Sequence, residues 1–346
     1  MTMRHAIILP GGTATQQLEL AELAERTGWD GVFVWEAAYG VDAWGLLSAM
    51  AARTTRVTLG TMLTPLPWRR PWKVASQVAT LDQLSGGRMV LGLGSSGPQV
   101  SEGWHGVRFA HQLQRTREDV AVVRMALERR RVAFDGETLT LPLPDGPGKA
   151  LKLTIAPVQE RLPIYLGATG PRNVALAGEI ADGWLPILMP PEHLDALSAP
   201  LREGAQRAGR TLDDFDVAPV VPVRVDADAG AARDAVRPFL ALYVGGMGSR
   251  ERNFYNELVA RYGFADAARE VQDLYLAGRQ RDAAAALPAA LIDQVALVGP
   301  PDHVRDRLAR FAAAGVGTLS VMPFARDAAA RLEQVRTVAR LAEAAR

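Results

Sequence analysis

The chain has 346 residues, of which 48% are hydrophobic and 22% are charged, and its formal net charge is +1 at pH 7. This is the composition of a globular protein, and so small a net charge supports neither a nucleic-acid partner nor a membrane-surface partner. The chain contains no cysteine, which excludes disulfides, thiolate nucleophiles and thiolate metal ligands.

The N-terminal part of the chain alternates strand-like and helix-like segments. Short apolar runs predict strands over residues 6–9, 31–35, 57–63 and 89–93. Apolar residues at helical spacing predict helices over residues 16–26, 42–53, 74–85 and 117–131. Strands that alternate with helices in this way indicate βαβ units and a parallel sheet.

Two segments depart from this alternation. Residues 132–160 are rich in Gly and Pro, and we interpret them as an inserted flap. Residues 228–290 read as a long helical excursion that is interrupted at residues 244–248. The remaining segments repeat the alternation of strands and helices. Strands are predicted over residues 164–166, 183–188, 217–225 and 318–321. Helices are predicted to start at residue 170 and to span residues 192–208, 301–314 and 328–345.

Eight main strands separated by helices predict an α/β protein of the (β/α)₈ TIM-barrel class with insertions. Eight such units need roughly 250 residues, and the flap and the helical excursion account for the surplus of about 100. Since no stretch of disordered composition divides the chain, we expect a single domain over residues 1–346.

A barrel of this class carries its site at the C-terminal ends of the strands. Few charged groups fall there, and no cluster of His, Asp and Glu has the spacing of a metal site. No nucleophile motif is present either. Backbone amides and apolar walls suit a large planar cofactor that brings its own chemistry. The segments at the predicted strand ends are Glu36, 61–63, 94–97, 167–173 and 184–187.

Two glycine-rich stretches are the candidate cofactor contacts. Gly94-Ser95-Ser96-Gly97 follows a buried strand, and glycine lets the backbone approach a ligand because it has no Cβ. Gly167-Ala168-Thr169-Gly170 precedes Pro171 and Arg172 at a predicted helix start, where free N–H groups and the helix dipole favour a phosphate. The alternative for each stretch is a plain strand-to-helix turn.

Two side chains are candidate proton-transfer groups. Glu36 ends a strand, where it could orient a ring or donate a proton, or could be a solvated cap. His105 could relay a proton, or could be a structural histidine bonded to a backbone carbonyl. The adjacent Arg69-Arg70 could meet an anionic cofactor tail or substrate, or could lie in a solvated loop.

Several longer motifs resemble the luciferase-like monooxygenase superfamily, whose members are barrel oxidoreductases that use FMN or the deazaflavin F420. The stretch from Thr80 to Arg88, with residues 91–94, resembles the superfamily as a whole. Residues 97–107, 173–186 and 243–248 resemble its F420-dependent branch. Residues 35–40 and 63–72 look more like its FMN-type members, so the chain reads as a mosaic of the two.

The resemblance implies further expectations. The third strand should end in a bulge with a non-proline cis peptide, which we place at Met62–Leu63. The family's acidic residue beside the ring falls on Glu36. Ala37 stands where some F420 members carry a catalytic His, so that role does not transfer. A homodimer is expected by family analogy, with the helical excursion as its surface. The residues expected to contact the cofactor are Met62, Leu63, Gly94, Ser95, Ser96, Gly97, Gly167, Ala168, Thr169, Gly170 and Arg172.

Three functions follow as hypotheses. The first is an F420-dependent oxidoreductase that transfers a hydride between the deazaflavin and a small organic substrate. The second is an FMN-dependent monooxygenase that uses O₂ and reduced FMN supplied by a separate reductase. The third is a non-catalytic flavin-binding barrel. We expect the flap and the helical excursion to supply the substrate pocket wall.

The location of the protein is also an expectation from the sequence. No apolar run reaches the length of a transmembrane helix, and the apolar residues near the N-terminus are too few for a signal peptide. We therefore expect a cytoplasmic protein.

Overall fold

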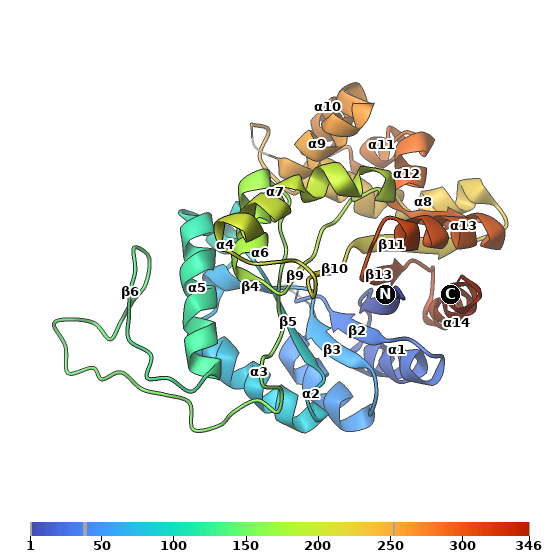
Figure 1. The fold of residues 1–346 in the computed structure, drawn as a ribbon. Helices are drawn as coiled ribbons and strands as arrows, with labels where there is room; N and C mark the ends of the chain where they lie inside the picture. Colours follow the sequence, from blue (N-terminus) through green and yellow to red (C-terminus); the bar gives the residue numbers. More distant parts are fainter. Residues whose placement is uncertain (1, 37–39, 252, 346) are drawn as a thin grey trace. The chain divides into compact units, whose positions relative to one another are not determined.

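The computed structural model describes residues 2–36, 40–251 and 253–345. Its internal contacts divide the chain into two compact units. Unit 1 comprises Met1–Gly31, Leu185–Ala199 and Asp216–Arg346, and unit 2 comprises Val32–Trp184 and Pro200–Phe215. Both units are built from strands that alternate with helices, as the sequence pattern predicts (Figure 1).

The strands of unit 1 form a parallel array in the order β1-β13-β11-β12. Ile7 of β1 and Val221 of β11 both align with Val321 of β13, so the buried side chains of these strands share one layer. Near-continuous burial is typical of parallel strands that are covered by helices. The bounds of the strands are β1 (Arg4–Leu9), β10 (Asp216–Val217), β11 (Val220–Val225), β12 (Leu297–Gly299) and β13 (Thr318–Pro323).

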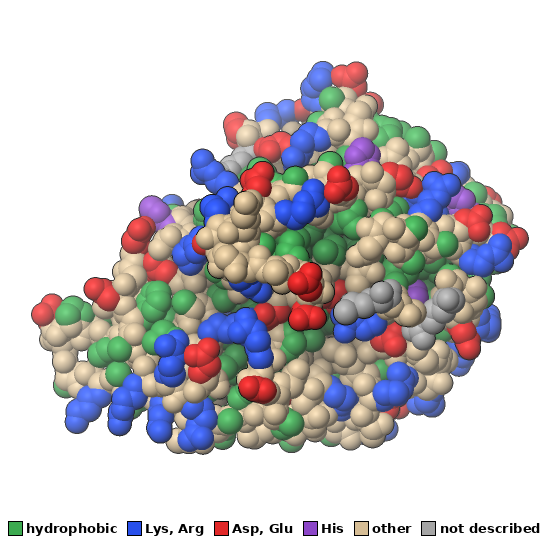
Figure 2. Space-filling model, viewed as in Figure 1, with side chains coloured by type: hydrophobic (Ala, Val, Ile, Leu, Met, Phe, Trp, Pro, Cys, Tyr) green, Lys and Arg blue, Asp and Glu red, His purple; other side chains and the backbone are tan. Residues whose placement is uncertain are grey.

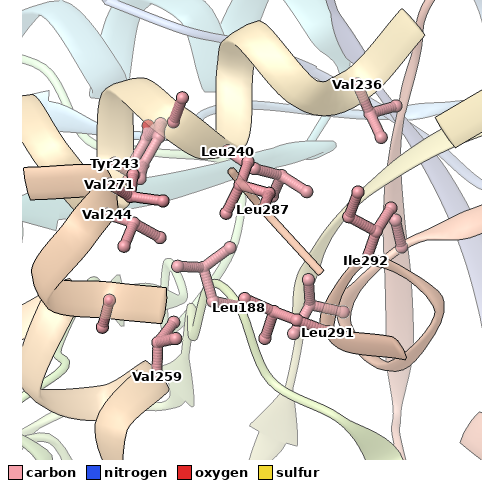
Figure 3. Close-up of a cluster of buried hydrophobic side chains, with 14 of the residues drawn as sticks. Leu188, Val236, Leu240, Tyr243, Val244, Val259, Val271, Leu287, Leu291 and Ile292 are labelled. Atoms are coloured by element: carbon pink, nitrogen blue, oxygen red, sulfur yellow. The ribbon is translucent and has the colours of Figure 1, made fainter. Parts of the chain in front are cut away.

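The helical excursion of unit 1 has its own apolar core. Figure 3 shows side chains from α8, α10 and α12 pointing toward Leu188, which is fully buried. Burying an aliphatic side chain of this size contributes about 1.5–3 kcal/mol, so the cluster stabilises helices that would be marginal alone. The helical elements of unit 1 are α1 (Ala14–Arg26), η2 (Pro191–His193), α8 (Ala229–Ala241), η3 (Leu242–Gly246), α9 (Phe254–Val259), η4 (Ala260–Phe264), α10 (Ala265–Leu276), α11 (Gln280–Ala285), α12 (Ala289–Val295), α13 (Pro301–Ala313) and α14 (Ala328–Ala344).

The predicted interruption at residues 244–248 overlaps a π-helical turn, η3. A Cβ added at Gly245 or Gly246 would lie 2.5 or 2.4 Å from the side chain of Tyr275 on α10. Asn253 donates from Nδ2 to the carbonyl of Val244 at 3.0 Å and caps α9. The glycines that resemble the F420 branch are therefore needed here for close helix packing.

The strands of unit 2 run in the order β9-β8-β5-β3-β2. β4 also pairs with β5, nearer the C-terminal end of β5 than β3 does. The pairings β3–β5, β5–β8 and β8–β9 are all parallel. The C-terminal ends of these strands therefore face the same way. The strand bounds are β2 (Gly31–Val34), β3 (Thr58–Thr61), β4 (Thr64–Pro65), β5 (Met89–Gly94), β8 (Ile164–Leu166) and β9 (Gly183–Trp184).

The helices of unit 2 begin and end on recognisable signals. Asp42 caps α2 by accepting from Gly45 N at 2.6 Å, and Gly86 ends α3 in the left-handed region. Gly178 on α6 lies so close to the backbone of α7 that a Cβ would be 2.0 Å from the Leu201 carbonyl oxygen. The helical elements are α2 (Ala43–Arg53), η1 (Leu66–Trp68), α3 (Pro71–Ser85), α4 (Pro98–Gly103), α5 (Gln112–Leu127), α6 (Pro171–Ile180) and α7 (Leu194–Arg207), the last shared between the units.

Some predicted boundaries are wrong. The helix predicted over 117–131 begins at Gln112 and ends at Leu127, because the mainly polar residues at its start hid its periodicity. The strand predicted over 183–188 is paired in unit 2 only at Gly183 and Trp184. After Gly97, Pro98 begins the short helix α4, for which the sequence analysis gave no bounds.

The flap lies along α5, where its small hairpin pairs β6 (Phe134–Asp135) with β7 (Thr140–Leu141) (Figure 1). Its far end is tied to the N-terminal end of β5, since Gln159 donates to the carbonyl of Met89 at 2.8 Å. This bond fixes the end of the flap at the N-terminal end of β5. The expectation that the flap supplies part of the pocket wall stays a prediction. Figure 2 shows Lys and Arg side chains along the lower left edge, where the flap lies in Figure 1, so this surface is solvated and basic.

Glu118 of α5 anchors the flap hairpin. Its carboxylate accepts from the backbone N of Glu137 at 2.7 Å and from Thr138 Oγ1 at 2.6 Å. Burial raises the pKa of Glu118, but hydrogen bonds from Thr138, Gln114 and Glu137 outweigh it and lower the pKa to about 2. Because the folded pKa lies below the ordinary value of 4.5, this anchoring is complete above that pH and is lost as the pH falls toward 2.

We expect Glu118→Ala to release the hairpin at neutral pH, because the Glu137 and Thr138 donors lose their acceptor. Thermolysin at pH 7 should then cleave residues 134–141 about fivefold faster or more, if the lost bonds are worth about 1–3 kcal/mol. Asp135→Ala changes an exposed carboxylate of the same hairpin and is the matched control. Equal cleavage of the two variants would contradict the assignment.

Candidate active site

The third strand of the chain carries a bulge at its C-terminal end. Gly60 of β3 aligns with Val90, whereas Thr64 of β4 aligns with Leu93. Residues 61–63 therefore stand opposite only residues 91–92, so one residue is extra on the bulged strand. The peptide bond between Met62 and Leu63 is cis, which confirms the bond predicted from the family resemblance.

Leu63 brings the two predicted glycine stretches together. A Cβ added at Gly94 would lie 2.6 Å from Leu63 Cδ1, and one added at Gly167 would lie 2.2 Å from Leu63 Cδ2. The Leu63 side chain thus fills the space that the two missing Cβ atoms leave. Gly94 and Gly167 are needed for this contact rather than for a special backbone angle.

A small hollow lies beside this contact at the C-terminal ends of β5 and β8. Gly94 and Ser95 line one side, and Gly167 and Ala168 line the other. Gly167 N donates to the Leu93 carbonyl at 2.8 Å, which joins the two stretches directly. Asn173, which also lines the hollow, ends the predicted strand-end segment 167–173. Sequence reasoning did not identify the remaining lining residues, Thr116, Leu166 and Leu176.

The loop 167–170 leads into α6 without a capping side chain. Gly170 is the N-cap and Pro171 the first helical residue, and no side-chain oxygen accepts from the first turn. Trp184 fixes the loop by donating from Nε1 to the Ala168 carbonyl at 2.8 Å. Arg172 is exposed in the first turn. An uncapped helix start of this kind can accept an anionic group.

Glu36 is buried, with 8% of its surface exposed, and is held by donors on both carboxylate oxygens. Oε2 accepts from Thr64 Oγ1 at 2.6 Å and from Trp44 Nε1 at 3.1 Å. Oε1 accepts from Arg69, through Nε at 2.9 Å and also through Nη2. The structure therefore contradicts the reading of Glu36 as a solvated cap. Ala37, which follows it, lies outside the described residues.

His105 stacks on Trp68, with the ring centroids 4.0 Å apart and the planes inclined by 11°. Its Nε2 is enclosed and has no hydrogen-bond partner within the described part of the chain. A structural histidine bonded to a backbone carbonyl was one of the two sequence interpretations, and among the described residues no such bond is made by Nε2. The imidazole is held by stacking.

The glycine stretches, Glu36 and His105 all contact residues 62–69, which we call the linking segment. Leu63 contacts the glycines, Thr64 and Arg69 bind Glu36, and Trp68 stacks on His105. Sequence reasoning favoured a solvated loop for Arg69 and missed Thr64. The structure buries Leu66 and Pro67 of η1 beside Arg69, so this stretch is not a solvated loop.

The motif from Thr80 to Arg88 has an architectural role. Asp82 is fully buried and accepts from the backbone N of Val158 at 2.7 Å and from Gln159 Nε2 at 2.6 Å. Arg88 donates to the carbonyls of Val57 and Thr54 at 2.6 and 2.8 Å. This motif ties α3, the flap and β3 together and does not reach the linking segment.

No group of three or more His, Cys, Asp or Glu side chains among the described residues is placed to hold a metal ion. None of the described helices combines the length and apolar character needed to cross a membrane.

Comparison with known proteins gives consistent matches over nearly the whole chain. Residues 2–318 match the family model described as luciferase-like monooxygenase. Rv3520c of Mycobacterium tuberculosis, provisionally named a coenzyme F420-dependent oxidoreductase, is 44% identical over 330 residues, which is 93% of each chain. The 5,10-methylenetetrahydromethanopterin reductase of Archaeoglobus fulgidus is 29% identical over 300 residues, which is 85% of each chain.

A solved structure also matches, that of the coenzyme F420 dependent tetrahydromethanopterin reductase from Methanopyrus kandleri. It superimposes with a TM-score of 0.83 at 26% identity and covers 98% of both chains. The fold class predicted from the sequence, an α/β (β/α)₈ barrel with insertions, is thereby confirmed.

Proposed function

Because the chain belongs to the luciferase-like monooxygenase family, we propose that it is an F420-dependent oxidoreductase that acts on a small organic substrate. The observation that carries this proposal is the 44% identity to Rv3520c over 93% of both chains. When bound, the deazaflavin would supply the hydride chemistry, and the protein would supply binding, orientation and proton transfer.

The described residues fit such a cofactor. The hollow at the strand ends is lined by the small residues Gly94, Ser95, Gly167 and Ala168, beside the Leu63 side chain. The uncapped start of α6 and the exposed Arg172 provide donors and positive charge for a phosphate. We assign the ring to the bulge at Met62–Leu63 and the phosphate to residues 167–170. We assign Ser96 and Gly97 to the same side of the cofactor as Gly94 and Ser95.

The two candidate acid–base residues have different roles in this proposal. His105 moves the proton, because its Nε2 has no partner within the described residues and its ring is held on Trp68. Glu36 positions the linking segment, because both its oxygens already accept from Thr64, Trp44 and Arg69. The substrate therefore lies on the His105 side of the segment.

The competing function is an FMN-dependent monooxygenase, favoured by the resemblance of residues 35–40 and 63–72 to FMN-type members. It would need O₂ and a separate reductase, whereas the F420 enzyme needs neither. A homodimer formed through the helical excursion is compatible with both. A non-catalytic flavin carrier is the third possibility.

The deciding experiment is a side-by-side titration with F420 and FMN, followed by absorbance of the reduced cofactor in the presence of candidate substrates. We expect saturable F420 binding and substrate-dependent oxidation or reduction of F420 without O₂. Tight FMN binding without affinity for F420 would overturn the proposal. Binding of F420 with no turnover across a broad substrate set would favour the carrier.

Within this proposal we expect His105→Asn to lower kcat by about 10²-fold or more, the usual contribution of a positioned acid–base group. F420 affinity should change less than about threefold, because His105 is not among the residues assigned to hold the cofactor. His111→Asn, at an exposed residue beyond α4, is the matched control. An unchanged kcat would remove His105 from the mechanism.

A further inference from the structure

A buried carboxyl on α5 lies next to the linking segment and has no role in the function proposed above. Asp119 is 3% exposed, and its Oδ2 has no hydrogen-bond partner within the described residues. The nearest cationic group is Arg115, one helical turn earlier, whose Nε lies 3.7 Å from that oxygen. This distance makes an ion pair but is too long for a hydrogen bond.

Arg115 joins Asp119 to the linking segment. Its Nη2 donates to the carbonyl of Pro67 at 3.1 Å. Pro67 is the middle residue of η1, between the bulge and the two side chains that reach the site. Trp68 stacks on His105, and Arg69 pairs with Glu36. A change in how Arg115 is held is therefore passed to both candidate acid–base residues.

The charge on Asp119 changes near neutral pH. Burial raises the pKa of Asp119 to about 7, against the opposing effect of Arg115 and with a further increase from the neighbouring Glu118. Arg70, which precedes α3, also faces the carboxyl and lowers its pKa. Glu118 is itself engaged by Gln114 and the flap hairpin. Asp119 is thus mainly protonated at pH 6 and mainly ionised at pH 8.

We propose that Asp119 is a positioning residue that acts through Arg115 and makes the hold on the linking segment depend on pH. When Asp119 is ionised, the ion pair keeps the Arg115 guanidinium directed at the Pro67 carbonyl. When Asp119 is protonated, Arg115 loses its counter-ion and the segment loses one restraint. The effect on turnover rests on the proposed function, whereas the effect on the segment does not.

The test follows the linking segment without any cofactor. The indole ¹⁵N–¹H signal of Trp68, assigned with Trp68→Phe, is recorded from pH 5.5 to 8.5. We expect its shift to move with a midpoint near pH 7 and to stay flat in Asp119→Asn. Arg115→Met should also flatten it, and this second variant keeps the test available if Asp119→Asn folds poorly. Asp266→Asn, at an exposed carboxylate of α10, is the control.

His105 stacks on Trp68, so the His105→Asn variant tests whether the imidazole contributes to the transition. The Trp68 transition must persist in His105→Asn if Asp119 is its source. A transition that survives in Asp119→Asn, or that disappears in His105→Asn, would overturn the proposal.

A second readout uses the loaded enzyme. If the ionised form is the active one, the rate of F420 turnover should rise about tenfold from pH 6 to pH 8, following the ionised fraction. In Asp119→Asn the same change should be under about twofold. Failure of F420 to bind would contradict the proposed function but would not affect the Trp68 result. If the Trp68 shift does not change with pH in an enzyme that turns over F420, only the role proposed for Asp119 is contradicted.

Discussion

Replacing Arg69 with Met should lower the free energy of unfolding by about 3–5 kcal/mol, the cost of leaving a buried charge without its partner. The physical reason is that Glu36 is 8% exposed and takes its only described cationic partner from Arg69. Thr64 and Trp44 would still donate to Oε2, but Oε1 would have no donor. Urea denaturation followed by circular dichroism measures the change.

A double-mutant cycle separates the ion pair from simple loss of packing. Glu36→Gln combined with Arg69→Met removes both charges, so the double variant should be more stable than Arg69→Met alone by at least about 1 kcal/mol. Additive single effects would show that the pair is not coupled. Arg70→Met changes the neighbouring exposed arginine and should shift stability by less than about 0.5 kcal/mol.

The second large effect is expected at Gly167. A Cβ at this position would lie 2.2 Å from Leu63 Cδ2, and Leu63 cannot turn away freely because its Cδ1 already fills the space at Gly94. Gly167→Ala should therefore cost about 1–3 kcal/mol of stability, the usual cost of overpacking, and weaken F420 binding at least tenfold. Thermal unfolding and the F420 titration measure the two effects.

Two variants make this prediction specific. Gly97→Ala places a methyl 3.4 Å from Gln99 Oε1, in ordinary contact, so it should be tolerated. Leu63→Ala in the Gly167→Ala background removes the clashing atoms and should restore most of the lost stability. If Gly97→Ala is as damaging as Gly167→Ala, or if Leu63→Ala gives no recovery, the contact described here is not the cause.

Positions that depend on local backbone requirements could be predicted from the sequence. Gly94 was singled out because the absence of a Cβ lets the backbone approach a ligand, and Gly167 because it opens a predicted phosphate loop. In the structure the Leu63 side chain fills the space beside both glycines. The cis bond at Met62–Leu63 was placed by family resemblance and is confirmed. The assignment of these residues to a cofactor stays a prediction.

The partners of Glu36 could not be predicted in this way. Trp44, Thr64 and Arg69 lie 8, 28 and 33 residues from Glu36 in the chain. They meet because β2, β3 and β4 bring their C-terminal ends to one edge of the array, with the one-residue bulge setting which side chains face Glu36. No periodicity in a single sequence records this register.

Two of the motifs that resemble the family, residues 80–88 and 243–248, lie away from the site. Asp82 and Arg88 hold α3, the flap and β3, and Gly245 and Gly246 hold α10. Such residues identify the fold because close packing and buried hydrogen bonds depend on them. The linking segment and His105 come from two other motifs, residues 63–72 and 97–107.

The amino-acid sequence alone was sufficient for the order of strands and helices, the barrel class and the two glycine stretches. Hydrophobic periodicity and the absence of a side chain are properties that each segment carries by itself. The enclosure of Glu36, the stacking of His105 on Trp68 and the bridge from Asp119 through Arg115 to Pro67 appear only when the strands are paired. These contacts join residues distant in the chain, so their geometry is decided by strand register and helix packing rather than by local preference.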